Sequence, residues 1–281
     1  MTVTAAAAAA IPPGRYRLVH VMRSEWTKLR SVRSIRWVLA AMVAGTLALG
    51  ITDCLVEASD WAHMAAASRA RFDPTDISLA GLAFAPLAIG IAGVLVMSGE
   101  YGSGLIRSTL AAVPRRAAVL AAKAAVVTGP ALAAGAVAVL GCVLAGRLVL
   151  PGHGLTQARG YELVWLGHGP VLRAAAGSVL YLGLIALLSV GIAAMVRDSA
   201  VAIGAVLALL YLFPILAGVV TDPRWDRHLQ QVGPMTAGLD IQATTGLRSL
   251  PLSPWAGLGV LAAWAGGALL AGGLVLRLRD A

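Results

Sequence analysis

The sequence predicts an all-α membrane protein with six transmembrane helices, preceded by an amphipathic interfacial helix, and with both termini in the cytoplasm. Composition is the first reason, because 59% of the 281 residues are hydrophobic, 12% are charged and the mean hydropathy is +0.82. A soluble domain carries roughly a quarter charged residues. The second reason is that six apolar stretches are each long enough to cross about 30 Å of hydrocarbon as a helix. The presence of only two cysteines excludes a disulfide scaffold or a multi-cysteine metal centre.

Residues 1–14 are predicted to be a disordered tail. They contain a run of six alanines followed by Pro12 and Pro13, and no basic residue precedes the apolar stretch. A signal peptide needs such a basic start and a longer apolar core, so this segment does not resemble one.

Residues 15–36 are predicted to form a cytoplasmic interfacial helix. At about 100° per residue, one face carries Leu18, Val19, Met22, Trp26 and Leu29. Basic residues surround this apolar stripe. We expect Trp26 to lie among the lipid headgroups and the arginines to lie near anionic lipid. The alternative is an ordinary basic flank that only fixes the topology.

Residues 37–281 are predicted to form the transmembrane domain. The apolar stretches lack period-two alternation and are much longer than the strands of a membrane barrel, which have about ten residues, so we expect helices. The predicted spans are residues 37–56, 77–98, 117–145, 171–196, 200–220 and 255–276.

The distribution of basic residues orients these spans, because cytoplasmic loops are enriched in Lys and Arg. An even number of spans places both termini on one side of the membrane. That side holds fourteen of the 22 Lys and Arg residues, whereas nine of the 13 acidic residues lie on the opposite side. We therefore expect both termini to lie in the cytoplasm. Only two of the 22 basic residues are lysines, and together with abundant Ala and Gly this is compatible with a GC-rich bacterial genome, so we expect the membrane to be a bacterial plasma membrane.

Three charged side chains lie within the predicted spans, each near an end: Asp53, Lys123 and Arg173. We expect all three to reach the membrane surface by snorkelling. A proton-coupled carrier is disfavoured, because it needs buried ionisable groups along its path.

Several apolar positions carry weaker structural signals. Pro214 is expected to kink the fifth span and to shape a cavity wall. Ala263, Gly267 and Ala271 recur every four residues in the sixth span and favour close helix contact. In a separate pair, Cys54 and Cys142 are expected near outer helix ends, where they either form a disulfide or act as small apolar side chains.

The chain lacks common catalytic motifs, so we expect that it is not an enzyme and binds no cofactor itself. A phosphate-binding loop needs a lysine followed by Ser or Thr, but Lys28 and Lys123 precede Leu and Ala. No histidine is followed by Glu as in zinc proteases, and no Gly-x-Ser-x-Gly elbow occurs. His153 and His168 share an outer loop with Glu162, where we expect a solvated loop and no metal site.

The loop after the second span, residues 99–116, is the most distinctive segment. It begins Gly-Glu-Tyr-Gly-Ser-Gly and ends Val-Pro-Arg-Arg. This composition predicts a glycine-rich turn, a short helix and a proline ahead of the next span. Such a loop forms a compact cytoplasmic protrusion that is suited to transmit a push. The alternative is a basic loop that merely satisfies the topology.

Two motifs resemble the permease subunits of ABC-2-type transporters, especially those of actinobacteria. The first is Ser-Glu-Trp-Thr-Lys-Leu-Arg-Ser at residues 24–31, followed by Arg33 and Trp37. The second is E-x-x-x-G-x-x-R-x-x-L-x-x-x-P-x-R at residues 100–116, followed by Lys123. The resemblance covers essentially the whole chain, since six spans with both ends inside also fit. A weaker match is Gly-Pro-Met-Thr-Ala-Gly at residues 233–238, where the family usually has leucine in place of the first glycine.

The resemblance implies an exporter in which two permease subunits form the path and two separate subunits bind ATP and Mg²⁺. The expected partners are an ATP-binding subunit, a second permease that is identical or different, and membrane lipids, without nucleic acid. Glu100 is expected to ion-pair within the loop or with the N-terminal helix, and Gly104 to permit a tight turn. The implied coupling residues are Glu100, Gly104, Arg107, Leu110, Pro114 and Arg116, and those of the interfacial helix are Glu25, Trp26, Lys28 and Arg30.

The last outer loop, residues 221–254, is too long for a simple hairpin. The resemblance implies that residues 229–245 form short helices that dip back into the membrane and cap the exit. An exposed loop is the alternative.

A second function fits the same features. A non-transporting membrane scaffold or immunity-type protein would hold a cytoplasmic or lipid partner with its basic N-terminal helix and second loop. A membrane-embedded enzyme fits less well, because the spans carry few ionisable groups. No single residue encodes the substrate or the direction of transport, although an apolar path is consistent with an amphipathic molecule.

Overall fold

A computed structural model shows a helical protein with six helices that are long and apolar enough to span a membrane. It describes residues 18–61, 63–69, 72–102, 104–105, 109, 115–153, 155 and 164–279, and every regular element within these ranges is a helix. The prediction of an all-α membrane protein with six spans is confirmed. The predicted tail at residues 1–14 lies outside the described residues, as do Arg107, Leu110 and Pro114.

The helices begin and end close to the predicted boundaries, and most spans extend a few residues further at one or both ends. Pro130 and Pro214 lie inside two of the spans, which continue as helices through both positions. The elements are α1 (Leu18–Ser31), α2 (Arg33–Asp60), α3 (Ala66–Arg69), α4 (Pro74–Leu79), η1 (Ala80–Ala83), α5 (Ala85–Gly102), α7 (Arg116–Val149), η2 (Leu150–His153), α8 (Gly169–Val196), α9 (Ser199–Val219), α10 (Pro223–Val232), α11 (Pro234–Leu239), η4 (Asp240–Gln242) and α12 (Pro254–Arg279).

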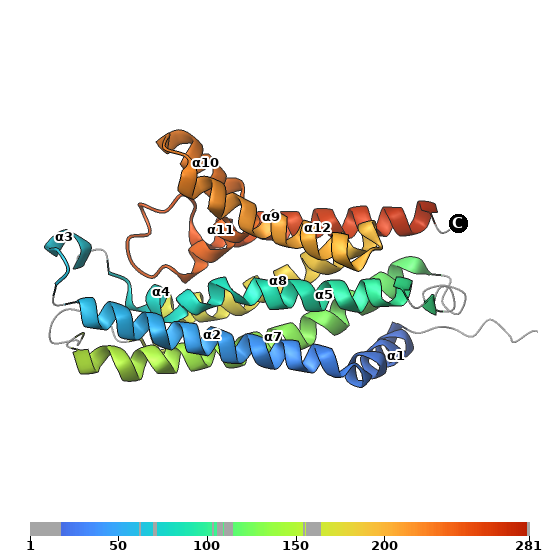
Figure 1. Cartoon of the computed structure of the whole chain (residues 1–281), viewed down its shortest axis with the longest axis horizontal. Helices are drawn as coiled ribbons and strands as arrows, with labels where there is room; N and C mark the ends of the chain where they lie inside the picture. The colour runs from blue at the N-terminus through green and yellow to red at the C-terminus, as the bar shows by residue number, and fades with distance from the viewer. Residues whose placement is uncertain are drawn as a thin grey trace, which may run out of the picture.

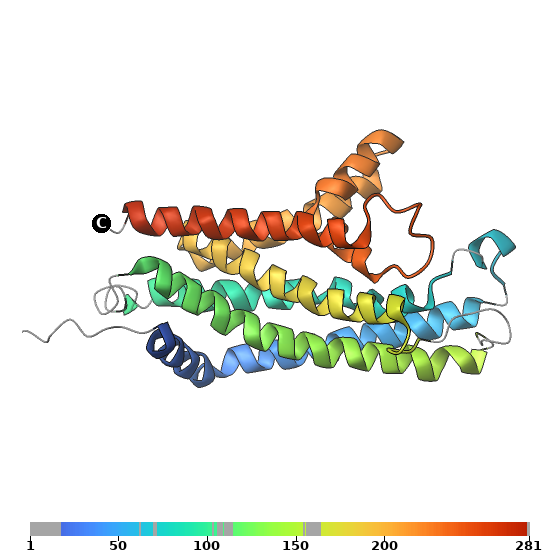
Figure 2. The ribbon, with the colours of Figure 1, turned by 180° about the vertical axis from the view of Figure 1, so that it is seen from behind.

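The six spans run along the long axis of the bundle, with α1 and the last turns of α12 at the same end (Figure 1). Helices α3 and α10 lie at the opposite end, and the view from behind shows the same arrangement (Figure 2). We refer to these as the α1 end and the α10 end. The segment that follows α5, which contains the distinctive second loop, therefore starts at the α1 end.

Helix α8 forms the centre of the bundle, because it packs against α5, α7, α9 and α12. Small residues allow its close approach to α12: a Cβ atom on Gly191 would lie 2.6 Å from the backbone of Ala268, and one on Gly272 would lie 2.7 Å from the carbonyl oxygen of Gly191. The predicted stripe of Ala263, Gly267 and Ala271 is on a different face of α12. At Gly267 an added Cβ would meet nothing within 4 Å, so no other described helix of the same chain packs closely there.

The second span is not one continuous helix. It consists of α4, the 3₁₀ turn η1 and α5, which together cover Pro74–Gly102. At η1 the chain lies against the backbone of α2, since a Cβ atom on Gly81 would collide with the carbonyl oxygen of Thr46 and the amide of Gly50. Glycine at this position permits the close backbone contact.

The N-terminal helix is shorter than the predicted segment of residues 15–36. Val32 has extended backbone angles, with φ −84° and ψ 98°, and separates α1 from α2. Arg33 and Arg36 therefore belong to the first span. Helix α1 packs mainly against α7 through Val21, Glu25 and Leu29.

Between α9 and α12 the chain turns back into the bundle through α10, α11 and η4, which we call the return segment (residues 223–242). The indole Nε1 of Trp264 donates a hydrogen bond to the carbonyl oxygen of Val232 at 3.0 Å. Trp264 lies ten residues after Pro254, which is about 15 Å along α12. The buried residues Met235 and Ile241 then hold α11 and η4 within the bundle. Residues 234–242 thus pack within the bundle, whereas α10 has no buried residue and projects from it (Figure 1). The dip of residues 229–245 into the membrane stays a prediction.

Cys54 and Cys142 are both fully buried and free. Their thiols lie 3.8 Å from the hydroxyl of Ser78 and the carbonyl oxygen of Thr46, respectively. They therefore act as small core side chains, which was one of the two expected alternatives.

Candidate functional site

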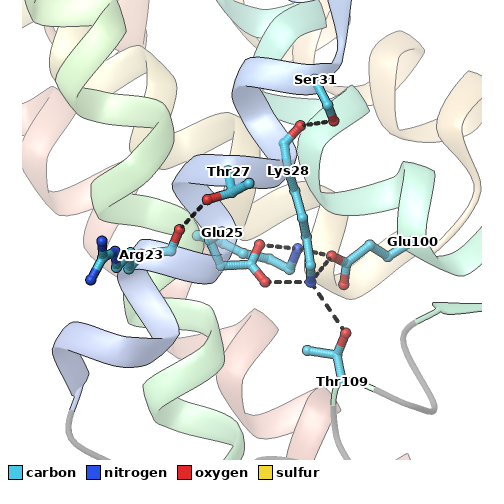
Figure 3. A network of polar contacts seen from close by, with 8 residues as sticks. Arg23, Glu25, Thr27, Lys28, Ser31, Glu100 and Thr109 are labelled. Atoms are coloured by element: carbon cyan, nitrogen blue, oxygen red, sulfur yellow. Dashed lines mark hydrogen bonds and ion pairs between the residues drawn. The ribbon is translucent and has the colours of Figure 1, made fainter.

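Four charged side chains from three helices meet at the α1 end, and we call them the ion cluster: Glu25 and Lys28 of α1, Glu100 of α5 and Lys123 of α7 (Figure 3). The Lys28 Nζ atom lies 2.7 Å from Glu25 Oε1 and 2.8 Å from Glu100 Oε1. The Lys123 Nζ atom lies 2.8 Å from Glu25 Oε2 and 2.8 Å from Glu100 Oε1. Each lysine thus bridges both carboxylates.

Local structure places these side chains. Glu25 and Lys28 are three residues apart, so they project from the same face of α1. Glu25 lies between Val21 and Leu29 in the buried stripe that packs on α7. Glu100 lies in the last turn of α5, where the second loop begins.

The ion cluster is buried on all but one side. Side-chain exposure is 1% for Lys123, 3% for Glu25 and 9% for Glu100, but 40% for Lys28. The prediction that Lys123 snorkels to the membrane surface is therefore wrong. Its ammonium turns inward because two carboxylates replace the water that it would otherwise seek, and two negative charges balance two positive ones.

Lys28 is the member of the ion cluster that remains open to solvent. Burial by itself lowers the pKa of its ammonium, but hydrogen bonds and charge interactions with Glu100 and Glu25 outweigh burial and raise the pKa above its ordinary value. The Lys28 Nζ atom also lies 3.4 Å from the hydroxyl of Thr109 in the second loop. The N-terminal helix is thus linked both to α5 and to the loop that follows it.

The structure confirms two expectations for the second loop. Glu100 pairs with the N-terminal helix, and Gly104 has a positive φ of 72°, a conformation that side chains rarely adopt. The Gly104 amide donates to the carbonyl oxygen of Tyr101 at 3.2 Å, which closes a tight turn.

Arg116 is not part of the ion cluster. Its guanidinium Nη1 donates to the carbonyl oxygen of Leu276 at 2.6 Å, at the C-terminal end of α12. It therefore anchors the last turn of α12 to the start of α7. Trp26 is 43% exposed and Arg30 is also exposed, so both point away from the buried face of α1.

A second polar site, at the α10 end, was missed by the sequence analysis. The carboxylate of Asp73 caps α4 by accepting from the amides of Thr75 and Asp76. It also accepts from the amide of Thr244 at 2.5 Å, from the hydroxyl of Thr244 at 2.6 Å and from the amide of Thr245 at 2.8 Å. The Asp-Pro pair at the start of α4 was a readable cap signal, but nothing local indicated the contact with residues that lie 171 positions away.

Asp240 of η4 lies near this second site. Burial, with a further contribution from the charge of Asp76, raises the pKa of the Asp240 carboxyl to about 7. Nearby, Arg173 donates to the carbonyl oxygen of Ala243 at 2.5 Å, so this arginine holds the end of the return segment.

Within the described part of the chain, no group of three or more His, Cys, Asp or Glu side chains is arranged to hold a metal ion. Glu162 lies outside the described residues, and His168 occupies the N-cap position of α8 without a side-chain capping hydrogen bond. The ion cluster pairs charges between three helices.

No protein-family model matches the chain, and no curated protein matches it either. The geometry of the two polar sites and the character of the six spans therefore carry the functional argument.

Proposed function

We propose that this protein is the transmembrane permease subunit of an ABC exporter of the ABC-2 type, in the bacterial plasma membrane. A separate partner subunit binds ATP and Mg²⁺, and two permease subunits form the translocation path. One observation carries the proposal. Glu100, at the start of the second loop, is ion-paired both to the N-terminal helix and to α7.

The ion cluster supplies a route for mechanical coupling. A partner that pushes on α1 or on the second loop moves Lys28, which is bonded to Glu25 and Glu100. Separating one buried charge from its partners is strongly unfavourable, so α1, α5 and α7 move together. Helices α5 and α7 both pack on α8, and the displacement therefore reaches the centre of the bundle.

The second span extends this route to the opposite end. It begins with Asp73 as the cap of α4 and ends near Glu100. Asp73 holds Thr244 and Thr245, which follow the return segment. A shift of α5 at the α1 end thus changes the hydrogen bonds of Asp73 with Thr244 and Thr245. In this proposal the return segment, which precedes these residues, caps the exit.

The proposed orientation places the α1 end in the cytoplasm. The excess of Lys and Arg at this end supports it, as does the exposed indole of Trp26 on the outer face of α1. In this position α1 lies along the membrane surface, where a cytoplasmic partner contacts it.

The first test is affinity purification of the full chain from its native membrane in mild detergent, followed by mass spectrometry. A stoichiometric ATP-binding subunit is expected. Its reproducible absence, with the chain folded and intact, would contradict the exporter and favour the membrane scaffold or immunity-type protein.

The coupling role is tested in the reconstituted complex with the variant Glu100→Gln. The readout is the ATP-dependent change in maleimide labelling of a cysteine placed at Ser249, which is exposed at the α10 end and requires no knowledge of the cargo. We expect this change to be lost while the partner still hydrolyses ATP. Glu57→Gln, at the far end of α2, is the matched control and should keep the response.

A double variant separates coupling from folding. Glu100→Gln combined with Lys28→Gln leaves Glu25 and Lys123 as a neutral buried pair. We expect it to unfold at a higher temperature than Glu100→Gln alone, yet to remain uncoupled. Restoration of the ATP-dependent labelling in the double variant would contradict the assigned role of Glu100.

A further inference from the structure

We propose that a groove between α8, α9 and α12 binds the hydrocarbon chain of an amphiphile that enters from the membrane leaflet at the α1 end. The groove has a volume of about 810 Å³ and is lined by residues of α8, α9 and α12 and by the last turn of α10. Ligand sites in proteins range from about 300 to about 1,000 Å³. The size therefore suits one long chain.

The return segment explains why the groove exists. Helix α9 packs on α5, α8, α10 and α11, and makes little direct contact with α12. At the α10 end the gap is closed by Val232, whose carbonyl oxygen accepts from Trp264. Towards the α1 end, small side chains of α12 leave the gap open, and an added Cβ on Gly267 would meet nothing within 4 Å.

The small-residue stripe predicted from the sequence finds its role here. Ala263, Gly267 and Ala271 all line the groove, whereas the close contact with α8 is made by Gly272 and by Ala268, which also lines the groove. Within the chain, the stripe thus borders open space.

The lining places the open end of the groove at the α1 end. On α8 the lining runs from Leu188 to Val196, which is the last residue of that helix. On α12 it runs from Val260 to Ala271, which is about 16 Å at 1.5 Å per residue and covers the middle of the span. A chain that enters at the α1 end therefore reaches the closed end of the groove under Trp264.

The lining selects an uncharged apolar occupant. Among the described residues that line the groove, none carries a charge, and Gln231 donates to the carbonyl oxygen of Pro251 at 3.0 Å. A charged head would lose its hydration inside, so the head stays outside the groove at the membrane surface.

The uncharged lining and the position of the groove between membrane-spanning helices favour a long-chain amphiphile as its occupant. A second copy of this chain is the competing occupant, and the cross-linking measurement below distinguishes the two. The status of the amphiphile as the exported cargo rests on the proposed function above.

The test is photolabelling of the full chain in phosphatidylcholine nanodiscs, with a long-chain alkyl glycerol that carries a diazirine on its chain. Labelled residues are located by mass spectrometry. We expect labelling to concentrate on the groove-lining turns of α8 and α12, near Ile192 and Gly267. Gly267→Leu should reduce this labelling about tenfold, because its side chain occupies the groove.

Gly266→Leu is the matched control. Gly266 neighbours Gly267 on the same helix, and an added Cβ meets nothing within 4 Å at either position, but Gly266 does not line the groove. Labelling in this variant should remain as in the wild type. Equal labelling in all three proteins would mean contact with bulk lipid only and would overturn the proposal.

A second measurement addresses the competing occupant. Efficient disulfide cross-linking between two copies that carry Ala263→Cys would show that a second chain covers the groove, and would also overturn the proposal. Because the labelling needs no ATP-binding subunit, the two proposals fail separately. A labelled groove without a co-purified partner leaves an amphiphile site in a protein that is no exporter.

Discussion

Lys123 illustrates how far the surroundings of one residue alter its behaviour. Seen alone, a lysine about two turns inside a span extends its ammonium to the surface. In the structure the ammonium lies 2.8 Å from two carboxylates, one on α1 and one on α5. The two carboxylates replace the water around the ammonium, so Lys123 can be buried, and the ion pairs connect α1, α5 and α7.

Removal of the Lys123 charge should destabilise the fold strongly. Lys123→Met leaves Glu25 and Glu100 buried with only Lys28 as a shared partner, and we expect a loss of about 3–5 kcal/mol of unfolding free energy. Lys28→Met is the comparison. It also leaves the two carboxylates with one shared lysine, but the Lys28 side chain is 40% exposed, so water replaces its ammonium and the loss should be smaller, about 1–2 kcal/mol. Thermal unfolding in detergent measures both. Equal effects of the two variants would contradict the burial argument.

Asp240 should make stability depend on pH. Its pKa in the fold is about 7, above the ordinary 3.8, so the folded state holds its proton more tightly than the unfolded state. The contribution of Asp240 to the free energy of unfolding is fully present below about pH 4 and is lost as the pH rises to about 7. In Asp240→Asn this decline should be reduced in melting curves recorded across that range. Asp60→Asn, at the exposed end of α2, should leave the decline unchanged.

At the level of elements, the return segment and α4 depend on each other. At the turn between α10 and α11, the indole of Trp264 donates a hydrogen bond to the carbonyl oxygen of Val232. After η4, Asp73 accepts from the amide of Thr245, and Arg173 donates to the carbonyl oxygen of Ala243. Asp73 serves two elements with one carboxylate. It caps α4 and also satisfies the amides of Thr244 and Thr245.

Asp73→Asn should loosen this junction. The amide side chain cannot accept all the hydrogen bonds of the carboxylate, and we expect a loss of about 2–3 kcal/mol from the cap and the charge-assisted bonds together. Hydrogen–deuterium exchange should rise at residues 240–250. Asp222→Asn tests specificity, because Asp222 caps the exposed helix α10 through a single bond to the Arg224 amide. Its effect should stay within α10.

At the scale of the whole molecule, two polar sites lie at opposite ends of one apolar bundle. The ion cluster joins α1, α5 and α7, and the Asp73 site joins α4 to the residues that follow the return segment. The second span carries Asp73 at one end and Glu100 at the other. The second span thus joins the proposed cytoplasmic side to the proposed exit through its backbone.

The proposed topology predicts opposite accessibility for the two ends. In intact cells, a membrane-impermeant maleimide should label Ser249→Cys at the α10 end and should label Ser31→Cys at the α1 end only after permeabilisation. The native Cys54 and Cys142 are fully buried and contribute little background. Labelling of Ser31→Cys in intact cells would contradict the proposed orientation and indicate the opposite one.

Much of the architecture followed from the sequence. The six spans were placed within a few residues, because hydrophobic length and internal backbone hydrogen bonding are local properties of a membrane helix. The turn at Gly104 was also predicted from its residue type. The partners of Lys123 were not, because they lie on other helices and Glu25 is 98 positions away in the chain.

The sequence by itself determined the number of spans, the end of the bundle that carries the basic excess, and the residue types at each helix terminus. Only the tertiary structure decided that Lys123 turns inward to Glu25 and Glu100, that Asp73 binds Thr244, and that the stripe around Gly267 borders a groove. The physical reason is the distance along the chain over which each interaction acts. Hydropathy and helix formation act over neighbouring residues, whereas charge pairing and cavity shape depend on how helices distant in the chain are packed.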